Sequence, residues 1–224
     1  MGKHLRIAVP SGALLAGACR ILGDAGIADV DPDALDRRLR IVDGDAVIAK
    51  VRPTDVPVYV EMGACDAGLV GKDVLWESDR SCYELVDLAF GGCRLVLAAP
   101  EGSAMAAGTW PASPRVATKY PHSARRLFDH IGVAADLVKL HGSVELAPAM
   151  GLADSVLDIT ATGTTLRANH LVEIMEAATS TARLIVNLAS LKTRSAEISR
   201  LAASLRRVVA ASGTGASQIP QGWG

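Results

Sequence analysis

The chain has 224 residues, of which 50% are hydrophobic, 4% aromatic and 21% charged, and its formal net charge at pH 7 is -1. This length accommodates one large or two small domains with a sizeable core, and abundant aliphatic with few aromatic residues is typical of an α/β protein with buried strands. The arginines are scattered and have no aromatic residues among them, so the sequence shows no basic surface for nucleic acid or anionic membranes and favours small-molecule ligands.

The first half of the chain predicts four strands, each followed by a helix or a loop. Apolar residues recur at helical spacing after the first strand until Gly26 offers a stop, and a short helix with Thr54 as its N-cap is expected after the second. The third strand leads into the segment KDVLWE. The four predicted strands are residues 5–10, 46–51, 65–71 and 93–100.

The second half begins with an aperiodic loop over 101–114, rich in small residues, and then continues the alternation. Strands are predicted at 115–120, 135–140, 155–160, 171–177 and 182–190. Helices are predicted at 123–132, at 145–153, where Pro148 breaks the pattern, and at 193–210, which has one apolar face. Such alternation indicates mostly parallel sheets that bind ligands at the carboxyl ends of their strands.

Cysteine spacing and the N-terminus give the expected compartment. Because the four cysteines include no C-x-x-C pair, we expect free, mostly buried thiols in a reducing environment. The segment MGKHLRIAVPSG contains only a short apolar patch, and no stretch approaches the roughly 20 apolar residues that a membrane span needs. A cytoplasmic protein is therefore expected.

The segment DITATGTTLRANH, residues 158–170, is the most informative motif because small hydroxyl residues follow directly on an apolar strand. Gly163 is free to adopt unusual dihedral angles, and the surrounding hydroxyls and backbone N–H groups offer a concave donor surface for phosphate. The preceding carboxylate, Asp158, is suited to accept hydrogen bonds from vicinal sugar hydroxyls. Ribose 5-phosphate is the ligand that this combination suggests. The alternative is a polar turn in which Asp158 or Thr162 caps the next helix.

Several further segments carry a resemblance to a known family. They are VRPTDVPVYVEMGACDAGLVGKDVL (51–75), FGGCRLVLAAP (90–100), VATKYPHSARRLF (116–128), KLHGSVELAPAMGLADSVLDITATGTTLRANHLVE (139–173) and STARLIVNLASLK (180–192). With these segments the chain resembles the short form of ATP phosphoribosyltransferase, the catalytic subunit for the first step of histidine biosynthesis. The resemblance runs from about Leu5 to about Val209 and is most specific in the long middle segment.

The resemblance implies a fold and partners. It implies two α/β domains with a periplasmic-binding-protein-like (type II) architecture and an active site in the cleft between the domains. Domain I is expected to comprise residues 1–97 and 180–211, and domain II residues 98–179 with the phosphoribosyl pyrophosphate loop. Residues 212–224 are expected to form a flexible tail. Short forms work with a histidyl-tRNA-synthetase-like regulatory subunit, so a hetero-oligomer around a catalytic homodimer is expected, with no nucleic-acid or membrane partner.

The implied reaction joins two small substrates. N1 of the adenine of ATP attacks C1 of 5-phosphoribosyl 1-pyrophosphate, which releases pyrophosphate and yields phosphoribosyl-ATP. No protein nucleophile is required. Catalysis is expected from the alignment of the substrates and from stabilisation of the leaving pyrophosphate by arginine and by Mg²⁺, which the substrate carries.

The resemblance also assigns roles to residues of the motif and of the first domain. Asp158 is expected to bind the ribose hydroxyls. Arg52 is the expected catalytic residue, because a guanidinium grips pyrophosphate in a bidentate manner, and its alternative role is a surface salt bridge. The residues expected to cradle the 5-phosphate are Thr160, Ala161, Thr162, Gly163, Thr164 and Thr165.

Further candidates lie at other turns that follow strands. Gly71, Lys72 and Asp73 are expected to bind a nucleotide or magnesium pyrophosphate, although Asp73 could simply be an N-cap. Glu145 and the pair Lys119 and Tyr120 are candidates for substrate binding as well. For these, the alternatives are a helix start for Glu145 and packing for Tyr120.

One departure from the family pattern concerns the turn after the first strand. The family usually carries Lys-Gly-Arg there, whereas this chain has Ser11, Gly12 and Ala13. The loss of an arginine that stabilises developing charge costs about 3–4 kcal/mol by analogy with oxyanion donors. Lys3, Arg20 or a subunit partner would have to compensate, or else activity is weakened.

Three other functions remain open at this point. A non-catalytic paralogue that binds nucleotide or acts as a scaffold would explain Ser11 and Ala13. A solute-binding receptor shares the implied architecture, but the short apolar patch of the N-terminal segment leads us to expect no signal peptide. A different phosphoribosyltransferase commonly places two adjacent acids before the loop, whereas here Leu157 precedes Asp158.

Overall fold

The computed structural model describes residues 4–213, which form two compact units. Unit 1 contains residues 4–92 and 181–213, and unit 2 contains residues 93–180. The chain therefore passes into unit 2 at the start of the fourth predicted strand, whereas the expected boundary at residue 97 lay within that strand. The reason is that this strand pairs along most of its length with two strands of unit 2. The predicted tail lies outside the described residues from position 214 onward.

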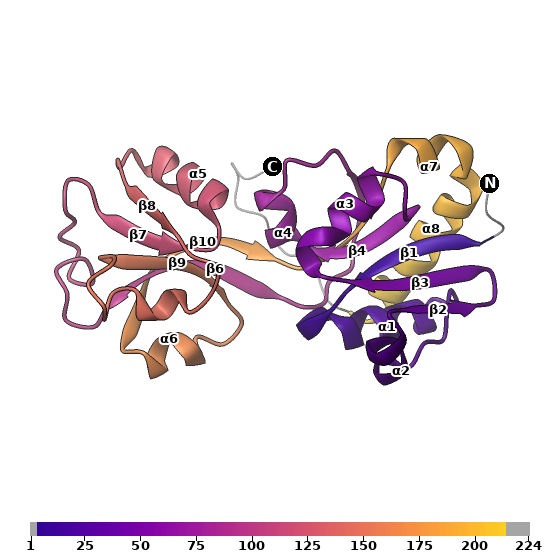
Figure 1. The fold of residues 1–224 in the computed structure, drawn as a ribbon, viewed down its shortest axis with the longest axis horizontal. Helices are drawn as coiled ribbons and strands as arrows, with labels where there is room; N and C mark the ends of the chain where they lie inside the picture. The colour runs from indigo at the N-terminus through magenta and orange to yellow at the C-terminus, as the bar shows by residue number, and fades with distance from the viewer. Residues whose placement is uncertain (1–3, 214–224) are drawn as a thin grey trace. The chain divides into compact units, whose positions relative to one another are not determined.

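The described part of unit 1 holds a six-stranded mixed sheet in the order β2-β3-β1-β4-β11-β5 (Figure 1). Its strands are β1 (Leu5–Pro10), β2 (Arg40–Asp43), β3 (Ala46–Val51), β4 (Ala67–Gly71), β5 (Tyr83–Asp87) and β11 (Ala182–Val186). The three central strands β3, β1 and β4 are parallel, while β2, β11 and β5 pair in the antiparallel sense. Strand β11 completes the sheet from a distant part of the sequence.

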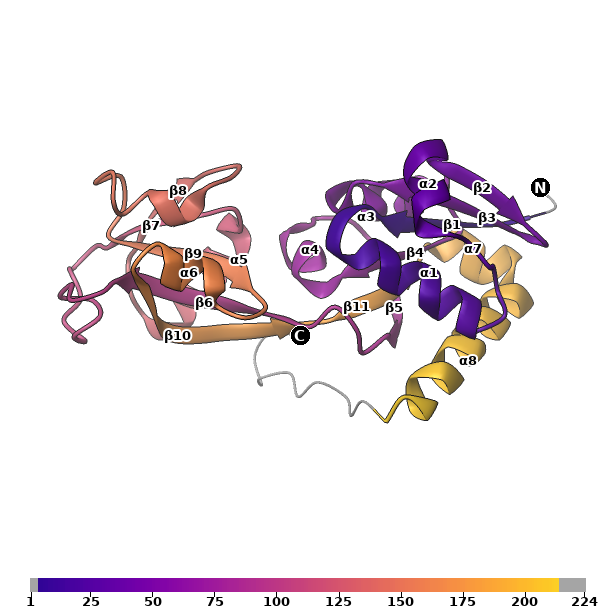
Figure 2. The same ribbon diagram turned by 90° about the horizontal axis from the view of Figure 1, so that it is seen from below.

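Helices cover both faces of this sheet. The helical segments are η1 (Gly12–Leu14), α1 (Leu15–Asp24), α2 (Pro32–Arg38), η2 (Pro53–Asp55), α3 (Val56–Glu61), α4 (Lys72–Glu77), α7 (Leu188–Thr193) and α8 (Ser195–Ala211). Alternate residues of the central strands, such as Ile7 and Leu69, pack with α1, α2 and α8 on one face, and their neighbours, such as Ala8 and Val70, pack with α3 and α4 on the other. Figure 2 shows α1 and α8 on the same face.

Unit 2 is built on a five-stranded mixed sheet in the order β10-β6-β9-β7-β8. The elements are β6 (Cys93–Pro100), β7 (Arg115–Thr118), α5 (Pro121–Ile131), β8 (Asp136–Lys139), η3 (Val144–Leu146), β9 (Ser155–Thr160), α6 (Thr164–Ala168) and β10 (Leu171–Ser180). Strands β9, β7 and β8 are parallel, and β6 and β10 are antiparallel to their neighbours. Helix α5 lies on one face (Figure 1), and on the other Leu166 of α6 and Val144 of η3 pack against the sheet residues Val96 and Val156.

The structure corrects several predictions from the sequence. The sheets are mixed, because the strands that return from one unit to the other pair in the antiparallel sense. Thr54 caps no helix: Arg52 is the N-cap of η2, and the following helix has Asp55 at that position without a side-chain cap. The predicted helix at 145–153 is reduced to η3 and turns. Helix α2 and strands β2 and β5 were not predicted from the sequence.

Other predictions are confirmed. Helix α5 ends at Gly132, which adopts the left-handed conformation with φ of 69°. The four cysteines are free thiols, of which Cys19 and Cys65 are buried and Cys82 and Cys93 are partly exposed. Each predicted strand overlaps a strand of the structure within residues 4–213.

Candidate phosphate-binding site

Strand β9 leads directly into the loop that the sequence singled out. Its first three residues are buried, whereas its last three, beginning with Asp158, are partly exposed. Since β9 and β7 are parallel with Leu157 opposite Thr118, the chain leaves both strands at the same edge of the sheet. The residues that follow β7, beginning with Lys119, therefore lie beside Asp158.

The loop after β9 is shaped by its own hydroxyls and by one glycine. Gly163 has φ of 72°, and its N–H donates to the Thr160 hydroxyl at 2.7 Å. The hydroxyls of Thr162 and Thr164 lie 2.8 Å apart. Gly163 is itself the N-cap of α6, and no side chain caps this helix. Asp158 and Thr162 therefore do not cap α6, and the hydroxyls of Thr160, Thr162 and Thr164 form hydrogen bonds within the loop instead.

Two charged side chains enclose Gly163. The guanidinium of Arg167 donates to the backbone carbonyl of Thr162 at 3.0 Å and to the Thr164 hydroxyl at 3.4 Å. A Cβ atom at Gly163 would lie 2.8 Å from Nη1 of Arg167 and 3.0 Å from Oε1 of Glu173. Glycine is thus favoured by the left-handed backbone, and a larger residue would also require the ends of the Arg167 and Glu173 side chains to move.

Asp158 is the most strongly buried acid beside this loop. Its side chain is 17% exposed and lies 3.9 Å from Nζ of Lys119, measured to Oδ2. Its Oδ1 accepts a hydrogen bond from the backbone N–H of Ile159 at 2.9 Å. Burial raises the pKa of Asp158 above its ordinary value, against the opposing effects of Lys119 and of the Ile159 N–H, and the charge of Glu145 adds to the rise.

The structure therefore gathers one set of predicted residues within unit 2. Asp158, Lys119 and Glu145 interact electrostatically, although they come from three separate segments of the chain. Tyr120 is the N-cap of α5, and its backbone N–H donates to the Thr118 hydroxyl at 2.8 Å. An acid, a cation and a loop rich in hydroxyls thus meet at one edge of the sheet, an arrangement suited to a phosphorylated sugar.

The predicted residues of unit 1 form separate groups. Lys72 forms a salt bridge with Glu84, and its backbone N–H donates to the carbonyl of Thr181 at 3.0 Å. The carboxylate of Asp73 folds back over Gly71, where a Cβ atom would lie 2.2 Å from its Oδ1. Gly71 is the N-cap of α4, and no side-chain hydrogen bond caps this helix. The N-cap alternative for Asp73 is therefore not what the structure has.

Arg52 follows the carboxyl end of β3 and is exposed. No salt bridge to Arg52 occurs within residues 4–213, so the surface salt-bridge alternative finds no partner there. Ser11 follows the neighbouring strand β1, and its backbone N–H donates to the carbonyl of Val51 at 2.8 Å. Arg20 is exposed on α1, while Lys3 lies outside the described residues.

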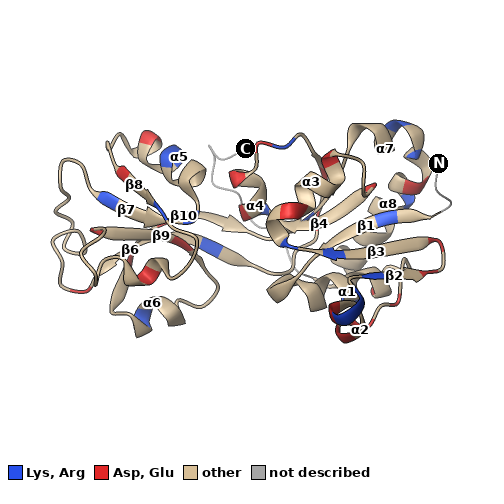
Figure 3. Ribbon diagram, viewed as in Figure 1, with Lys and Arg blue, Asp and Glu red and all other residues tan. Residues whose placement is uncertain are grey.

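Sequence reasoning missed three charged residues of unit 2. Arg167, Glu173 and Arg94 adjoin the loop or its neighbours, but only Arg167 gave a signal, as the basic residue four positions after Gly163. Figure 3 shows acidic and basic residues interspersed over the elements of both units. Arg94 and Glu173 are far apart along the chain, so their positions in the sequence do not reveal that they pair.

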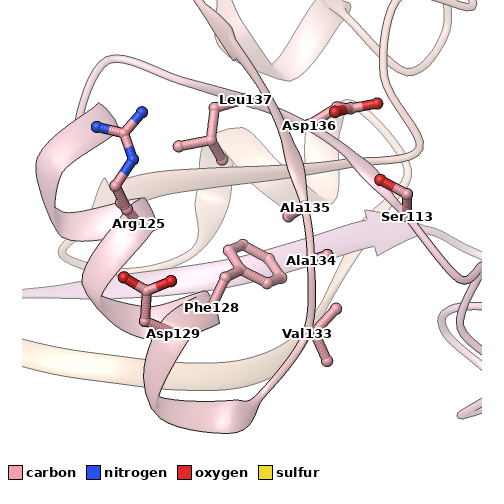
Figure 4. A pocket seen from close by; sticks show the side chains of 9 residues that line it. All are labelled: Ser113, Arg125, Phe128, Asp129, Val133, Ala134, Ala135, Asp136 and Leu137. Atoms are coloured by element: carbon pink, nitrogen blue, oxygen red, sulfur yellow. The ribbon is translucent and has the colours of Figure 1, made fainter.

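Unit 2 also has a cavity of about 430 Å³ away from these residues, between α5 and the segment leading into β8 (Figure 4). Arg125 and Asp129 line one side, and Phe128 and Leu137 form an apolar floor. Across residues 4–213, no group of three or more His, Cys, Asp or Glu residues is placed to hold a metal ion. In the same range, no helix combines the length and the apolar character needed to cross a bilayer.

Comparison with known proteins identifies relatives over nearly the whole chain. A family model described as ATP phosphoribosyltransferase matches residues 52–207. A protein named ATP phosphoribosyltransferase from Rubrobacter xylanophilus is 50% identical, with 92% of this chain and 96% of the relative covered. One of the same name from Deinococcus radiodurans is 45% identical over 94% of this chain and 93% of the relative.

Solved structures agree with the sequence comparisons. The ATP phosphoribosyl transferase (HisG:HisZ) complex from Thermotoga maritima contains a chain that is 32% identical, with a TM-score of 0.78, 92% of this chain covered and 99% of that one. The periplasmic aliphatic sulphonate binding protein from Escherichia coli is 14% identical, with a TM-score of 0.60 and coverage of 94% and 74%. The second likeness shows the periplasmic-binding-protein-like fold alone.

Proposed function

The chain belongs to the ATP phosphoribosyltransferase family, and we propose that the segment from Asp158 to Thr165 holds the ribose 5-phosphate part of one substrate. The enzyme condenses ATP with 5-phosphoribosyl 1-pyrophosphate in the first step of histidine biosynthesis. The comparisons extend over nearly the whole chain and do not favour a non-catalytic paralogue. The observation that carries the proposal is the half-buried carboxylate of Asp158 directly before a loop that exposes threonine hydroxyls around Gly163.

Each part of this site suits one part of the sugar phosphate. The Asp158 carboxylate accepts hydrogen bonds from vicinal ribose hydroxyls, and Lys119 keeps the local charge balanced. The exposed hydroxyls of Thr162, Thr164 and Thr165 donate to phosphate oxygens. The guanidinium of Arg167 adds positive charge and, through its bond to the Thr162 carbonyl, fixes the path of the loop.

The chemistry needs position and charge rather than a protein nucleophile. Adenine N1 forms a bond to ribose C1 as the bond from C1 to the pyrophosphate oxygen breaks, and the leaving group takes the electron pair. A fixed ribose presents C1 to the attacking nitrogen and reduces the entropic cost of bringing the substrates together, an effect worth about 7–11 kcal/mol in favourable cases. Cationic groups then stabilise the negative charge that develops on pyrophosphate.

The pyrophosphate groups are assigned to unit 1 in this proposal. Arg52 is the catalytic cation, since its guanidinium is exposed and forms no salt bridge within the described chain. Mg²⁺ arrives with the pyrophosphate and neutralises part of its charge; such ions commonly bind through substrate phosphates and one or two carboxylates. Gly71, Lys72 and Asp73 bind the magnesium pyrophosphate in this proposal, and the ion is carried by the substrate. Lys72 also forms a salt bridge with Glu84.

The partner assignment follows the same family relationship. The complex from Thermotoga maritima pairs HisG with HisZ, and for this chain a histidyl-tRNA-synthetase-like regulatory subunit around a catalytic homodimer is part of the proposal. Such a partner is also a candidate source of the cations that Ser11 and Ala13 do not supply. The cytoplasmic location expected from the sequence stays a prediction.

The loop assignment is tested by Thr162→Val, with Thr109→Val as the matched control on another exposed loop of unit 2. Phosphoribosyl-ATP formation is followed with Mg²⁺, with and without the regulatory subunit. Loss of one hydroxyl donor to a charged phosphate costs about 1.5–3 kcal/mol, so the KM for phosphoribosyl pyrophosphate should rise about tenfold or more while the KM for ATP and the control variant stay unchanged. An unchanged KM in Thr162→Val removes the phosphate from this loop.

A further inference from the structure

A cluster of three charged side chains lies on the sheet of unit 2 beside the loop. Arg94 of β6 forms a bidentate salt bridge with Glu173 of β10, in which Nη1 lies 2.8 Å from Oε2 and Nη2 lies 3.0 Å from Oε1. Nη1 also lies 3.0 Å from Oε2 of Glu176. Two glutamates thus share one arginine, so the cluster as a whole carries one net negative charge.

The cluster is held next to the loop by strand pairing. Arg94 stands opposite Thr160 in the register of β6 with β9, and β10 pairs along the other edge of β6. Glu173 extends toward the loop, where its Oε1 lies 3.0 Å from the place that a Cβ atom of Gly163 would occupy. An oxygen of one glutamate therefore occupies the space beside Gly163 that a side chain at this position would need.

Two carboxylates are an unexpected neighbour for a loop that holds a phosphate. Like charges at short distance repel, and at a partly exposed site the effect remains substantial within a Debye length of about 8–10 Å. Arg94 removes much of that repulsion, because its guanidinium faces both carboxylates. Its bidentate contact also fixes where the carboxylate of Glu173 lies, since a planar fork matches a carboxylate in one orientation.

We propose that Arg94 is a positioning residue for the 5-phosphate: it holds Glu173 against the loop at Gly163 and cancels the charge that Glu173 and Glu176 would otherwise direct at the bound phosphate. The inference rests on the proposed function, because it presumes that the loop holds the phosphate. Under this inference, affinity for phosphoribosyl pyrophosphate also requires Arg94, which acts through the two glutamates and does not itself contact a substrate.

A merely structural role for the cluster predicts different results. Exposed ion pairs contribute little to stability and have no preference for either substrate. Unit 2 supplies a matched control in Arg115, whose Nη2 lies 3.0 Å from Oδ1 of Asp154 and whose own backbone N–H donates to the same carboxylate. This pair is also partly exposed, but it lies at the opposite, amino end of β7.

The test measures both KM values and kcat in Arg94→Gln, Arg94→Lys, Arg94→Gln with Glu173→Gln, and Arg115→Gln. Arg94→Gln should raise the KM for phosphoribosyl pyrophosphate about tenfold, leave the KM for ATP unchanged, and lose part of this defect at high salt. Arg94→Lys, which keeps the charge but not the fork, should lie between it and wild type. The double variant should return to within about threefold of wild type, and Arg115→Gln should match wild type.

Two results would overturn the inference: a KM for phosphoribosyl pyrophosphate within twofold of wild type in Arg94→Gln, or a double variant as impaired as the single one. Should Arg94→Gln fail to fold, Glu173→Gln alone decides, since removal of a negative charge should leave affinity for phosphoribosyl pyrophosphate equal or higher, and a tenfold loss contradicts the inference. Thr162→Val separates the two hypotheses. If Thr162→Val is impaired and Arg94→Gln is normal, only this inference fails.

Discussion

Substitution of Asp158 by asparagine should weaken substrate binding while leaving the fold at least as stable. The side chain is 17% exposed, and burial raises the pKa of Asp158, so folding disfavours its charged form at neutral pH. A group of this kind lowers the free energy of unfolding as the pH rises from its unfolded pKa through its folded pKa. An uncharged asparagine at this position removes that cost. The variant should therefore melt at the same temperature as wild type or higher at pH 7, and the difference should shrink as the pH falls below about 4.

Binding should change in the opposite direction. Asparagine keeps one acceptor oxygen and replaces the other with a donor, so at least one hydrogen bond from a ribose hydroxyl to a charged group is lost. Such a bond contributes about 1.5–3 kcal/mol, which corresponds to a rise of about 10- to 150-fold in the dissociation constant of phosphoribosyl pyrophosphate. The Lys119 ammonium, 3.9 Å from Oδ2 in the wild type, would keep its charge without a counter-charge at this position.

Thermal unfolding with and without ligand measures both effects in one experiment. At a ligand concentration of 100 times the wild-type dissociation constant, wild type gains about 2.7 kcal/mol, and a variant that binds about 30-fold more weakly gains only about 0.9 kcal/mol. Asp129→Asn, at an exposed position on α5, is the control and should behave as wild type. A clear fall in melting temperature without ligand, or an undiminished shift with ligand, would show that Asp158 is a structural residue.

Two further predictions concern the loop and the core of unit 1. Gly163→Ala places a methyl group against Arg167 and Glu173 at a φ of 72°. The KM for phosphoribosyl pyrophosphate should therefore rise, with little change in the KM for ATP. A KM for phosphoribosyl pyrophosphate equal to that of wild type would show that the loop tolerates a side chain. Asp66 and Arg194 are a buried pair with side chains 5% and 8% exposed, so Asp66→Asn should cost about 3–5 kcal/mol in urea unfolding at pH 7. Burial alone would raise the pKa of Asp66, but Arg6 and Arg194 hold it below its ordinary value, so the stability it adds is present above about pH 4 and is lost as the pH falls through the folded pKa. The difference in the free energy of unfolding between wild type and Asp66→Asn, measured with urea, should therefore be smaller at pH 3 than at pH 7. An equal difference at the two pH values would contradict this.

Local signals in the sequence were sufficient where a segment's neighbours matter little. The helix ending at Gly132 and the strand leading to Asp158 were predicted because a glycine stop and a run of apolar residues act locally. The signal for α2 was equally local, with Asp31 accepting from the N–H of Asp33 and Pro32 in the first turn, but its short length obscured it. Strand β2, which is only half-buried, lacks a continuous apolar run.

Strand direction was less predictable, because it depends on where the chain returns. Alternation of strands and helices suggested parallel sheets, but β11 and β6 pair in the antiparallel sense after crossing between the units. Their sequences, ARLIV and CRLVLAAP, are apolar runs that suit either direction. The unit boundary was also hard to predict from the sequence, which placed it within β6. In the structure it lies at the start of β6, because the whole strand pairs with β10.

The sequence by itself determined the family and the elements with strong periodicity, and it indicated the segment from Asp158 to Thr165 as a candidate site, because these features depend on residues close together along the chain. Only the tertiary structure decided what surrounds that segment. Lys119 reaches Asp158 because β7 and β9 are parallel neighbours, and Arg94 meets Glu173 across 79 residues because β6 pairs with β10. Charged residues so far apart in the sequence interact only after folding brings them within a few ångströms. The interaction energy of such a pair therefore cannot be predicted from the positions of its two residues in the sequence.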